Sequence, residues 1–184
     1  MRILSIALRT VTVVCFAFMM SSASCDLLNG ADDVTFEAKL PLEFVINEKA
    51  ISSTPKQYTY SKTLDATQNA DVLKYKDKIK KITVNKISYV ISGYAAGGAT
   101  VLFTNGKLVV ASSGKTIAEA ASVDLLSTAE ADLTADLAGF NELGELLKDD
   151  KSETVNLVGT FSSTPVAFTV TAYFQTTITA SALK

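Results

Sequence analysis

The side chains of this 184-residue chain that could take part in chemistry are 19 carboxylates, 17 basic groups and two cysteines. The chain contains no histidine and no tryptophan. Without histidine, neither a histidine general base nor a histidine metal site can form. Two cysteines are too few for a four-cysteine zinc site or a disulfide framework. The formal net charge of −2 argues against nucleic acid as the main partner.

Serine–lysine catalysis and phosphate binding also leave recognisable patterns, and the chain contains neither pattern in the context that the chemistry requires. No Ser-x-x-Lys stands at the start of an expected helix. Ser113-Gly114-Lys115-Thr116 contains Gly-Lys-Thr, but the glycine that opens a phosphate-binding loop is absent five residues earlier. No Gly-Lys-Ser/Thr follows Gly97-Gly98 either. We therefore expect a protein that is not an enzyme, with no catalytic residue and no cofactor.

Two charged clusters are candidate binding sites. Lysines 74, 76, 78, 80, 81 and 86 enclose only one acid, Asp77. They could bind anionic lipid head groups or acidic polysaccharide. The simpler interpretation is the solvated face of a short helix and the next strand, because lysine lacks the bidentate geometry of arginine.

The second cluster consists of ten acids between residues 119 and 153. Among them, Asp149, Asp150 and Glu153 could bind Ca²⁺ weakly through their oxygens. They lack the spaced pattern and the central glycine of a calcium loop. We interpret these acids as solubilising charge and expect no metal site.

Cys25 has the most specific surroundings in the chain. An almost wholly apolar run over residues 3–20 follows Arg2, contains Arg9, and ends in the small residues 21–24. This is the pattern of a cleaved secretory signal. The apolar stretch after Arg9 is shorter than the roughly 20 residues that a membrane-spanning helix needs.

The stretch Ser22-Ala23-Ser24-Cys25 resembles the lipobox of bacterial lipoproteins in a relaxed form, with Ser22 where leucine is usual. The resemblance implies cleavage before Cys25 and acylation of Cys25 as the first residue of the mature chain. Ordinary signal cleavage is the alternative. It would remove Cys15 and leave Cys25 as a lone thiol in an oxidising compartment.

The domain organisation follows from this division. We expect a signal peptide at 1–24, a lipidated tether at 25–33 and a single β-rich domain at 34–184. Cleavage before Cys25 would remove both arginines and leave 160 residues with a net charge of −4. A chain of that length can bury one substantial core.

Apolar and polar residues alternate over 35–47 and over 166–179, which predicts two long half-buried strands that could pair with each other. Pro41 suggests that the first of them lies at a sheet edge or contains a bulge. Asn105-Gly106 predicts a type I′ hairpin between two further strands. Shorter runs predict strands at 58–64, 82–92 and 155–161, the second of them with a bulge between Val84 and Ile87.

Two segments change to helical spacing. Val72 and Tyr75 predict a short helix near 69–80. The pattern Ser127-Thr128-Ala129-Glu130 is typical of a capping box and predicts a helical insertion near 127–148, with a stop at Gly139.

Together these elements predict a mainly β fold: an antiparallel two-sheet β-sandwich of about seven strands with the two helical segments. The alternative is a curved sheet or half-open β-barrel around the helices. We recognise no family for the mature domain.

We expect a non-catalytic lipoprotein of the bacterial cell envelope, anchored to the outer membrane through Cys25. The domain would bind a protein or a glycan, or contribute to envelope structure. The alternative function is a carrier of a lipid-like or other apolar small molecule, which needs a cavity of roughly 300 Å³ or more.

Overall fold

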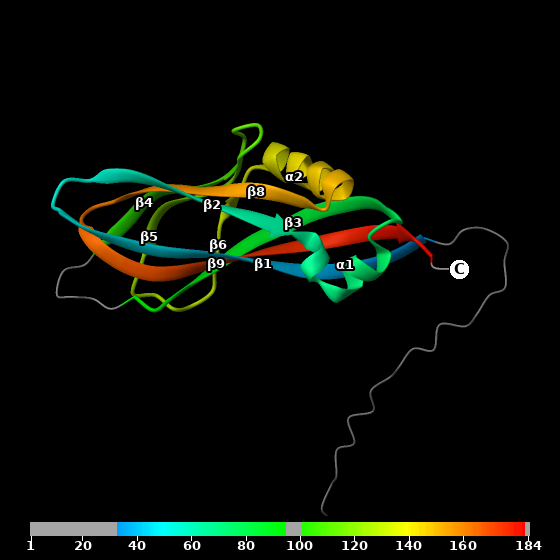
Figure 1. The fold of residues 1–184 in the computed structure, drawn as a ribbon, viewed down its shortest axis with the longest axis horizontal. Coiled ribbons are helices and arrows are strands. Elements are labelled where there is room, and N and C mark those ends of the chain that lie inside the picture. The colour runs from blue at the N-terminus through cyan, green and yellow to red at the C-terminus, as the bar shows by residue number, and fades with distance from the viewer. Residues whose placement is uncertain (1–32, 95–100, 183–184) are drawn as a thin grey trace, which may run out of the picture. The chain divides into compact units, whose positions relative to one another are not determined.

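The computed structural model describes residues 33–94 and 101–182, which form two packed antiparallel sheets (Figure 1). Cys25 and Gly97-Gly98 lie outside the described residues. One sheet has the strand order β1-β9-β3-β6, and the other has the order β2-β8-β4-β5-β7. The predicted β-sandwich is therefore confirmed, and the half-open barrel is not the arrangement that forms.

The strands are β1 Asp33–Ser52, β2 Lys56–Asp65, β3 Ile79–Ser92, β4 Leu102–Val110, β5 Thr116–Asp124, β6 Ala131–Asp132, β7 Thr134–Ala135, β8 Ser152–Phe161 and β9 Thr164–Ser181. The helices are a 3₁₀ turn at Ala66–Gln68, α1 Ala70–Tyr75 and α2 Leu137–Asp150.

The two long alternating strands pair with each other as expected. β1 and β9 run antiparallel in one register from Asp33 opposite Ser181 to Glu48 opposite Val166. Because side chains alternate across a strand, the apolar set of each strand faces the second sheet and the polar set faces solvent. β1 is the edge strand of its sheet, where a proline such as Pro41 is tolerated because its position needs no N–H in the ladder.

The core lies between the sheets and is richest in aromatic side chains near β8. The ring of Phe161 lies 4.9 Å from that of Phe103 and 5.8 Å from that of Phe168, centroid to centroid. Gly159 makes room for Phe103, since a Cβ at position 159 would lie 2.1 Å from a ring carbon. Phe161 and Phe103 belong to one sheet and Phe168 to the other, so this cluster joins the two layers.

The predicted Asn105-Gly106 hairpin is wrong. β4 continues through both residues, and the residue pairing of β4 with β8 shifts between Thr104 and Lys107. Asn105 has φ +52°, so the asparagine occupies a bulge within one strand. Asparagine tolerates positive φ in a bulge as readily as in a turn, which is why the dipeptide was misleading.

The helical insertion near 127–148 begins later than predicted. Asp136 is the N-cap, and its side chain accepts a hydrogen bond from the backbone N–H of Gly139. Residues 127–136 are not helical, and Glu130 closes no capping box because its carboxylate accepts a hydrogen bond from Ser88. Gly139 does not stop the helix but lies inside it.

The first helix is shorter than the predicted 69–80 segment. Asn69 caps α1 by accepting hydrogen bonds from the N–H groups of Asp71 and Val72, and the helix ends at Tyr75. Ile79 belongs to β3. The predicted irregularity in β3 is present as a shift in residue pairing between Val84 and Lys86. No helix among residues 33–94 and 101–182 is long and apolar enough to cross a membrane.

Helix α2 packs against both sheets through two glycines. A Cβ on Gly139 would lie 2.0 Å from the carbonyl oxygen of Thr116 in β5, and one on Gly144 would lie 2.4 Å from that of Ile82 in β3. The helix backbone therefore touches the backbone of one strand in each sheet. Phe140, Leu143 and Leu147 are buried on the same helix. Helix α2 thus closes the sandwich on the side where β3 and β5 would otherwise be open.

Substituting either glycine should destabilise the fold. We expect Gly139→Ala and Gly144→Ala each to lower the free energy of unfolding by roughly 2 kcal/mol or more, because the methyl group meets backbone that cannot rotate away. Urea unfolding followed by circular dichroism measures the change. Leu137→Ala on the same helix is the control, since Leu137 is 74% exposed and should change stability little. Equal stability of all three variants would contradict this packing.

Candidate functional site

Residues 127–136, called here the strap, connect β5 to α2 and cross the open side of the sandwich. The backbone N–H of Leu133 donates to the carbonyl of Ile87 in β3 at 3.0 Å. The N–H of Asp136 donates to the carbonyl of Ile117 in β5 at 2.8 Å. Through the short strands β6 and β7, the strap pairs first with β3 and then with β5. It therefore ties one sheet to the other.

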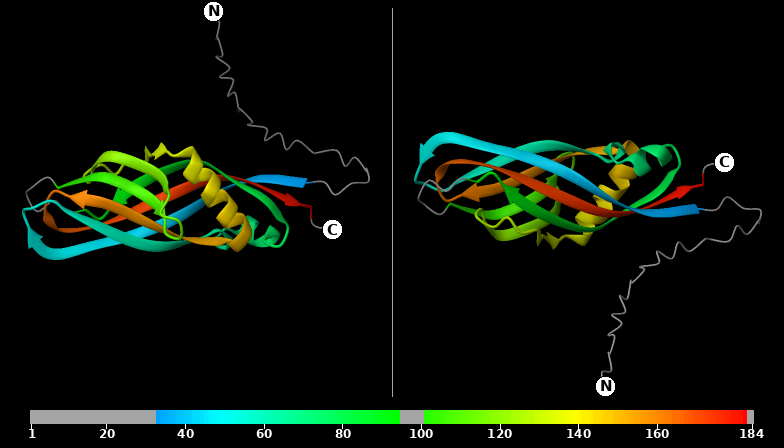
Figure 2. Two further views of the ribbon diagram at one scale, coloured as in Figure 1. Left: turned by 90° about the horizontal axis from the view of Figure 1, so that it is seen from above. Right: turned by 90° about the horizontal axis from the view of Figure 1, so that it is seen from below.

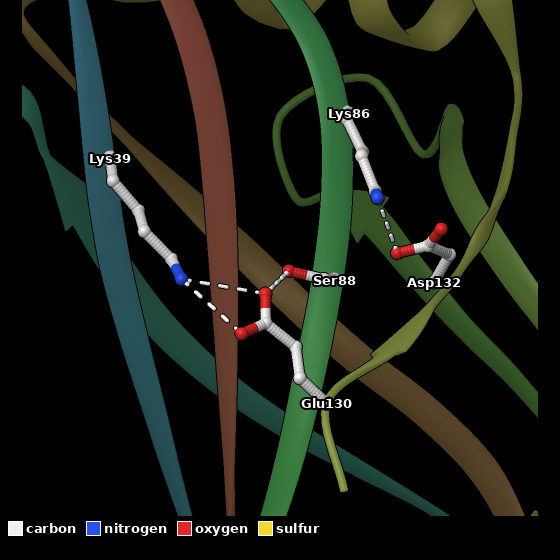
Figure 3. Close-up of polar contacts among 5 residues, drawn as sticks. All are labelled: Lys39, Lys86, Ser88, Glu130 and Asp132. Carbon is white, nitrogen blue, oxygen red and sulfur yellow. Dashed lines mark hydrogen bonds and ion pairs between the residues drawn. The ribbon is translucent and has the colours of Figure 1, made fainter.

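The most connected polar cluster in the described residues fastens the strap to the outer face of the four-stranded sheet (Figure 3). The hydroxyl of Ser88 on β3 donates to Oε1 of Glu130 on the strap at 2.5 Å. Lys39 reaches from β1 and places its Nζ 3.4 Å from both oxygens of Glu130. The same ammonium lies 4.0 Å from the centre of the Tyr173 ring on β9. The cluster therefore joins three strands and the strap.

A second ion pair holds the strap nearby. Lys86 Nζ on β3 lies 2.8 Å from Oδ1 of Asp132 (Figure 3). Both side chains are about half exposed, so this pair, like the one between Lys39 and Glu130, is a surface contact of modest strength.

The charge state of Glu130 and the burial of Ser88 suit a cluster that holds the strap in place better than a catalytic site. The hydrogen bond from Ser88, and then the ammonium of Lys39, hold the pKa of Glu130 below its usual range, so the carboxylate is ionised at neutral pH and is a weak base. Ser88 itself is completely buried, with 0% of its surface exposed. A serine nucleophile must reach its substrate, and this hydroxyl does not reach the surface.

A shallow polar depression lies on the same outer face. Glu37 and Lys39 border it from β1, Asn85 borders it from β3, and Gln175 of β9 lies at its floor. Asn85 donates to the hydroxyl of Thr177 at 2.7 Å. The depression offers hydrogen-bonding groups of both kinds to a ligand on the surface.

The lysine cluster predicted from the sequence is divided by the structure. Lys80 pairs with Asp33 at 2.5 Å, and Lys78 donates to the carbonyl of Ala182 at 3.2 Å. Lys86 belongs to the strap contact described above. The remaining three lysines are exposed and pair with no acid among the described residues. They are Lys74, Lys76 and Lys81.

The acidic cluster is also dispersed. Glu142 pairs with Lys115 at 3.0 Å, whereas Glu145 and Asp149 share Lys148. In the described parts of the chain, no three acidic or cysteine side chains come together as a set of metal ligands. Ser113, Gly114 and Lys115 lie in the turn between β4 and β5, where Gly114 has φ +75°, and Thr116 is the first residue of β5.

The carrier function requires space between the sheets. The apolar pocket there is lined by Phe103, Leu125, Leu133, Phe168 and other core residues, and its volume is about 30 Å³. Pockets for small ligands measure roughly 300–1,000 Å³. This pocket is too small for a lipid, so it gives the carrier function no support.

No protein-family model and no curated protein matches this chain. The fold is similar to solved structures of viral proteins. These include a chain of Desmodium yellow mottle tymovirus (11% identity, covering 86% of this chain and 93% of that chain, TM-score 0.43) and one of turnip yellow mosaic virus (11%, 82% and 97%, 0.37). A third is the decameric BFDV capsid protein (9%, 80% and 99%, 0.44). Likenesses this weak carry no inference about function.

Sequence reasoning missed the cluster around Glu130. Ser88 and Lys39 lie 42 and 91 residues from Glu130, and they meet it only because β1, β9 and β3 are neighbours in one sheet. The Ser-x-x-Glu pattern drew attention to Glu130 for a local helix contact, which the structure does not contain. The signal that could have found the cluster is the pairing order of the strands.

Glu130→Gln should loosen the strap. Because the substitution removes the charge that Lys39 contacts and weakens the bond from Ser88, we expect exchange of the Leu133 amide hydrogen to become roughly threefold faster. In the wild type the stabilisation is present above the ordinary glutamate pKa and is lost as the pH falls through the lowered pKa of the folded protein.

Hydrogen exchange measured by NMR tests this prediction. Glu145→Gln is the matched control, since Glu145 forms an exposed ion pair with Lys148 within α2 and not with the strap. An equal effect of the two variants on the Leu133 amide would contradict the fastening role of Glu130.

Proposed function

We propose that this protein is a non-catalytic lipoprotein of the bacterial cell envelope. It is anchored to the outer membrane by an acylated Cys25 and presents a β-sandwich for macromolecular binding or envelope structure. One observation carries the proposal: the lipobox-like Ser22-Ala23-Ser24-Cys25 follows an apolar signal-like run and stands only eight residues before β1 begins at Asp33. A multiply acylated cysteine holds a domain firmly, since each buried CH₂ contributes about 0.8 kcal/mol.

The arrangement of the strands supports a role in presentation. Asp33 starts β1 beside Ser181 near the end of β9, so the segment from Cys25 reaches the sandwich at that end. The turns between β1 and β2 and between β8 and β9 lie together at the opposite end (Figure 1). Their residues meet where Ser52 pairs with Thr164. Anchored through Cys25, the sandwich directs this second end away from the lipid.

The end opposite the anchor carries exposed apolar side chains. Ile51 is 89% exposed, and Leu102 is 40% exposed. The carbonyl of Leu102 accepts a hydrogen bond from the N–H of Ser162, so the start of β4 lies beside the turn between β8 and β9. Both residues lie at strand ends, which the rigid sandwich holds next to its connecting turns. This end is therefore where the protein or glycan partner would bind.

The polar cluster around Glu130 supports a non-catalytic role. Its serine is buried, its carboxylate is ionised, and both are engaged in holding the strap. The small apolar pocket between the sheets leaves partner binding to the surface of the sandwich.

Fractionation of bacteria that produce the full chain tests the anchor. We expect the wild type in the detergent-soluble membrane fraction and Cys25→Ala shifted largely out of it, because the variant has no acylation site. Cys15→Ala is the matched control, since Cys15 lies within the signal and would be removed with it. Equal distribution of the Cys25→Ala and Cys15→Ala proteins would contradict the proposal.

A further inference from the structure

We propose that the end of the sandwich nearest Cys25 is a second membrane contact, at which Lys74, Lys76 and Lys81 bind anionic lipid head groups. The inference rests on the proposed lipid anchor, because the anchor brings this end to the membrane. The ligand is the phosphate-bearing surface of a bilayer. Three observations carry the proposal: the place of these lysines in the fold, the absence of acid partners for them among the described residues, and the exposed leucine beside them.

The lysines lie where the tether enters the domain. Helix α1 and the start of β3 are at the end where β1 begins and β9 finishes (Figure 2). Two contacts fix this arrangement: the ion pair of Lys80 with Asp33, and the bond from the N–H of Ser181 to the carbonyl of Lys78 at 2.9 Å. From Cys25 to Asp33 the chain can span at most about 29 Å. An acylated Cys25 therefore keeps this end of the domain close to the lipid.

The charge at this end is positive and partly unneutralised. Residues 71–81 contain five lysines and two acids, Asp71 and Asp77, and Asp33 at the start of β1 is a third acid among the described residues nearby. The carboxylate of Asp33 forms an ion pair with Lys80. The side-chain ammonium groups of Lys76 and Lys81 have no hydrogen-bond or ion-pair partner among the described residues. The ammonium of Lys74 lies over the Tyr75 ring, at 5.2 Å.

The acids on α2 do not neutralise these three lysines. Glu142 is paired with Lys115, and Lys148 is shared by Glu145 and Asp149. Lysines without carboxylate partners are available to phosphate groups, and an ammonium provides the point charge that phosphate binding needs.

Helix α1 also offers an apolar group to the bilayer. Leu73 is 50% exposed and precedes Lys74 directly, whereas Val72 on the same helix is completely buried. An exposed leucine beside lysines is the pattern of segments that lie in the head-group region. Electrostatic attraction to a bilayer decays within about 10 Å, so it acts only on a surface held close to the lipid. A tether of at most about 29 Å lets this end of the domain approach the lipid to within that distance.

Vesicle binding by the mature chain, residues 25–184 with Cys25→Ala, tests the lysines without the anchor. This chain keeps every described residue and hence the whole described core. We expect it to bind vesicles of phosphatidylcholine and phosphatidylglycerol in equal parts, but not vesicles of phosphatidylcholine alone. Adding Lys74→Gln, Lys76→Gln and Lys81→Gln should weaken the binding roughly tenfold or more. Raising the salt concentration should weaken it as well.

The matched control replaces Lys49, Lys56 and Lys62 with glutamine. These lysines are exposed, pair with no acid among the described residues and change the net charge equally, but they lie on β1 and β2 and not on α1 or β3. Urea unfolding should show equal stability of the two triple variants.

Equal loss of binding in the two triple variants, or equal binding to both kinds of vesicle, would overturn the proposal. Binding to a sulfated polysaccharide but not to vesicles would assign the lysines to another ligand and would also overturn it. The anchor is tested separately, by fractionation of the full chain, so a failure of the lysine contact and a failure of the anchor give different results.

Discussion

The antiparallel pairing of β1 with β9 is the constraint on which the rest of the domain depends. Its register, continuous from Asp33 to Glu48, joins the first described strand to the last and sets which face of each strand is buried. Within this pairing the buried hydroxyl of Thr176 donates to the carbonyl of Ala38 at 3.0 Å, so the polar group inside the sheet is satisfied. β3 pairs with the other edge of β9 and brings α1 beside the start of β1. The positions of the start of β1 and of the opposite turns follow from this order.

The second requirement is closure of the side between β3 and β5. Helix α2 approaches both strands through glycines, and the strap adds backbone bonds to each sheet. The polar contacts of Glu130 and Asp132 lie on the outer face of the four-stranded sheet. There they hold the strap in place without burying a charged group. The result is a well-filled core, which leaves the surface of the sandwich for interactions with other molecules.

The sequence predicted the fold best where side-chain alternation is long and regular. β1 and β9 were found from alternation alone. The short helix α1 was found from the helical spacing of Val72 and Tyr75. β5 was missed for two reasons. It contains several small residues, alanine above all, and two consecutive residues within it, Ile117 and Ala118, are both buried, which breaks the alternation of buried and exposed side chains. The prediction also split β4 at Asn105 into two strands. One extra strand and one missed strand cancel, so the expected number of long strands, seven, equals the observed number.

The candidate site was less accessible from the sequence than the fold. Contacts between Glu130, Ser88 and Lys39 depend on strand order, and no local pattern encodes that order. Local patterns instead favoured a helix at Ser127, because the same Ser-x-x-Glu spacing serves a capping box. Cys25 differs from this cluster, because its predicted acylation depends only on the residues next to it in the sequence and requires no knowledge of the fold.

The central claim is that Cys25 is the acylated first residue of a membrane-anchored β-sandwich. Mass spectrometry of the amino-terminal peptide of the protein extracted from membranes tests it most directly. The account predicts a peptide that begins at Cys25 and carries the mass of acyl chains. A peptide that begins at another residue, or an unmodified Cys25, would contradict it.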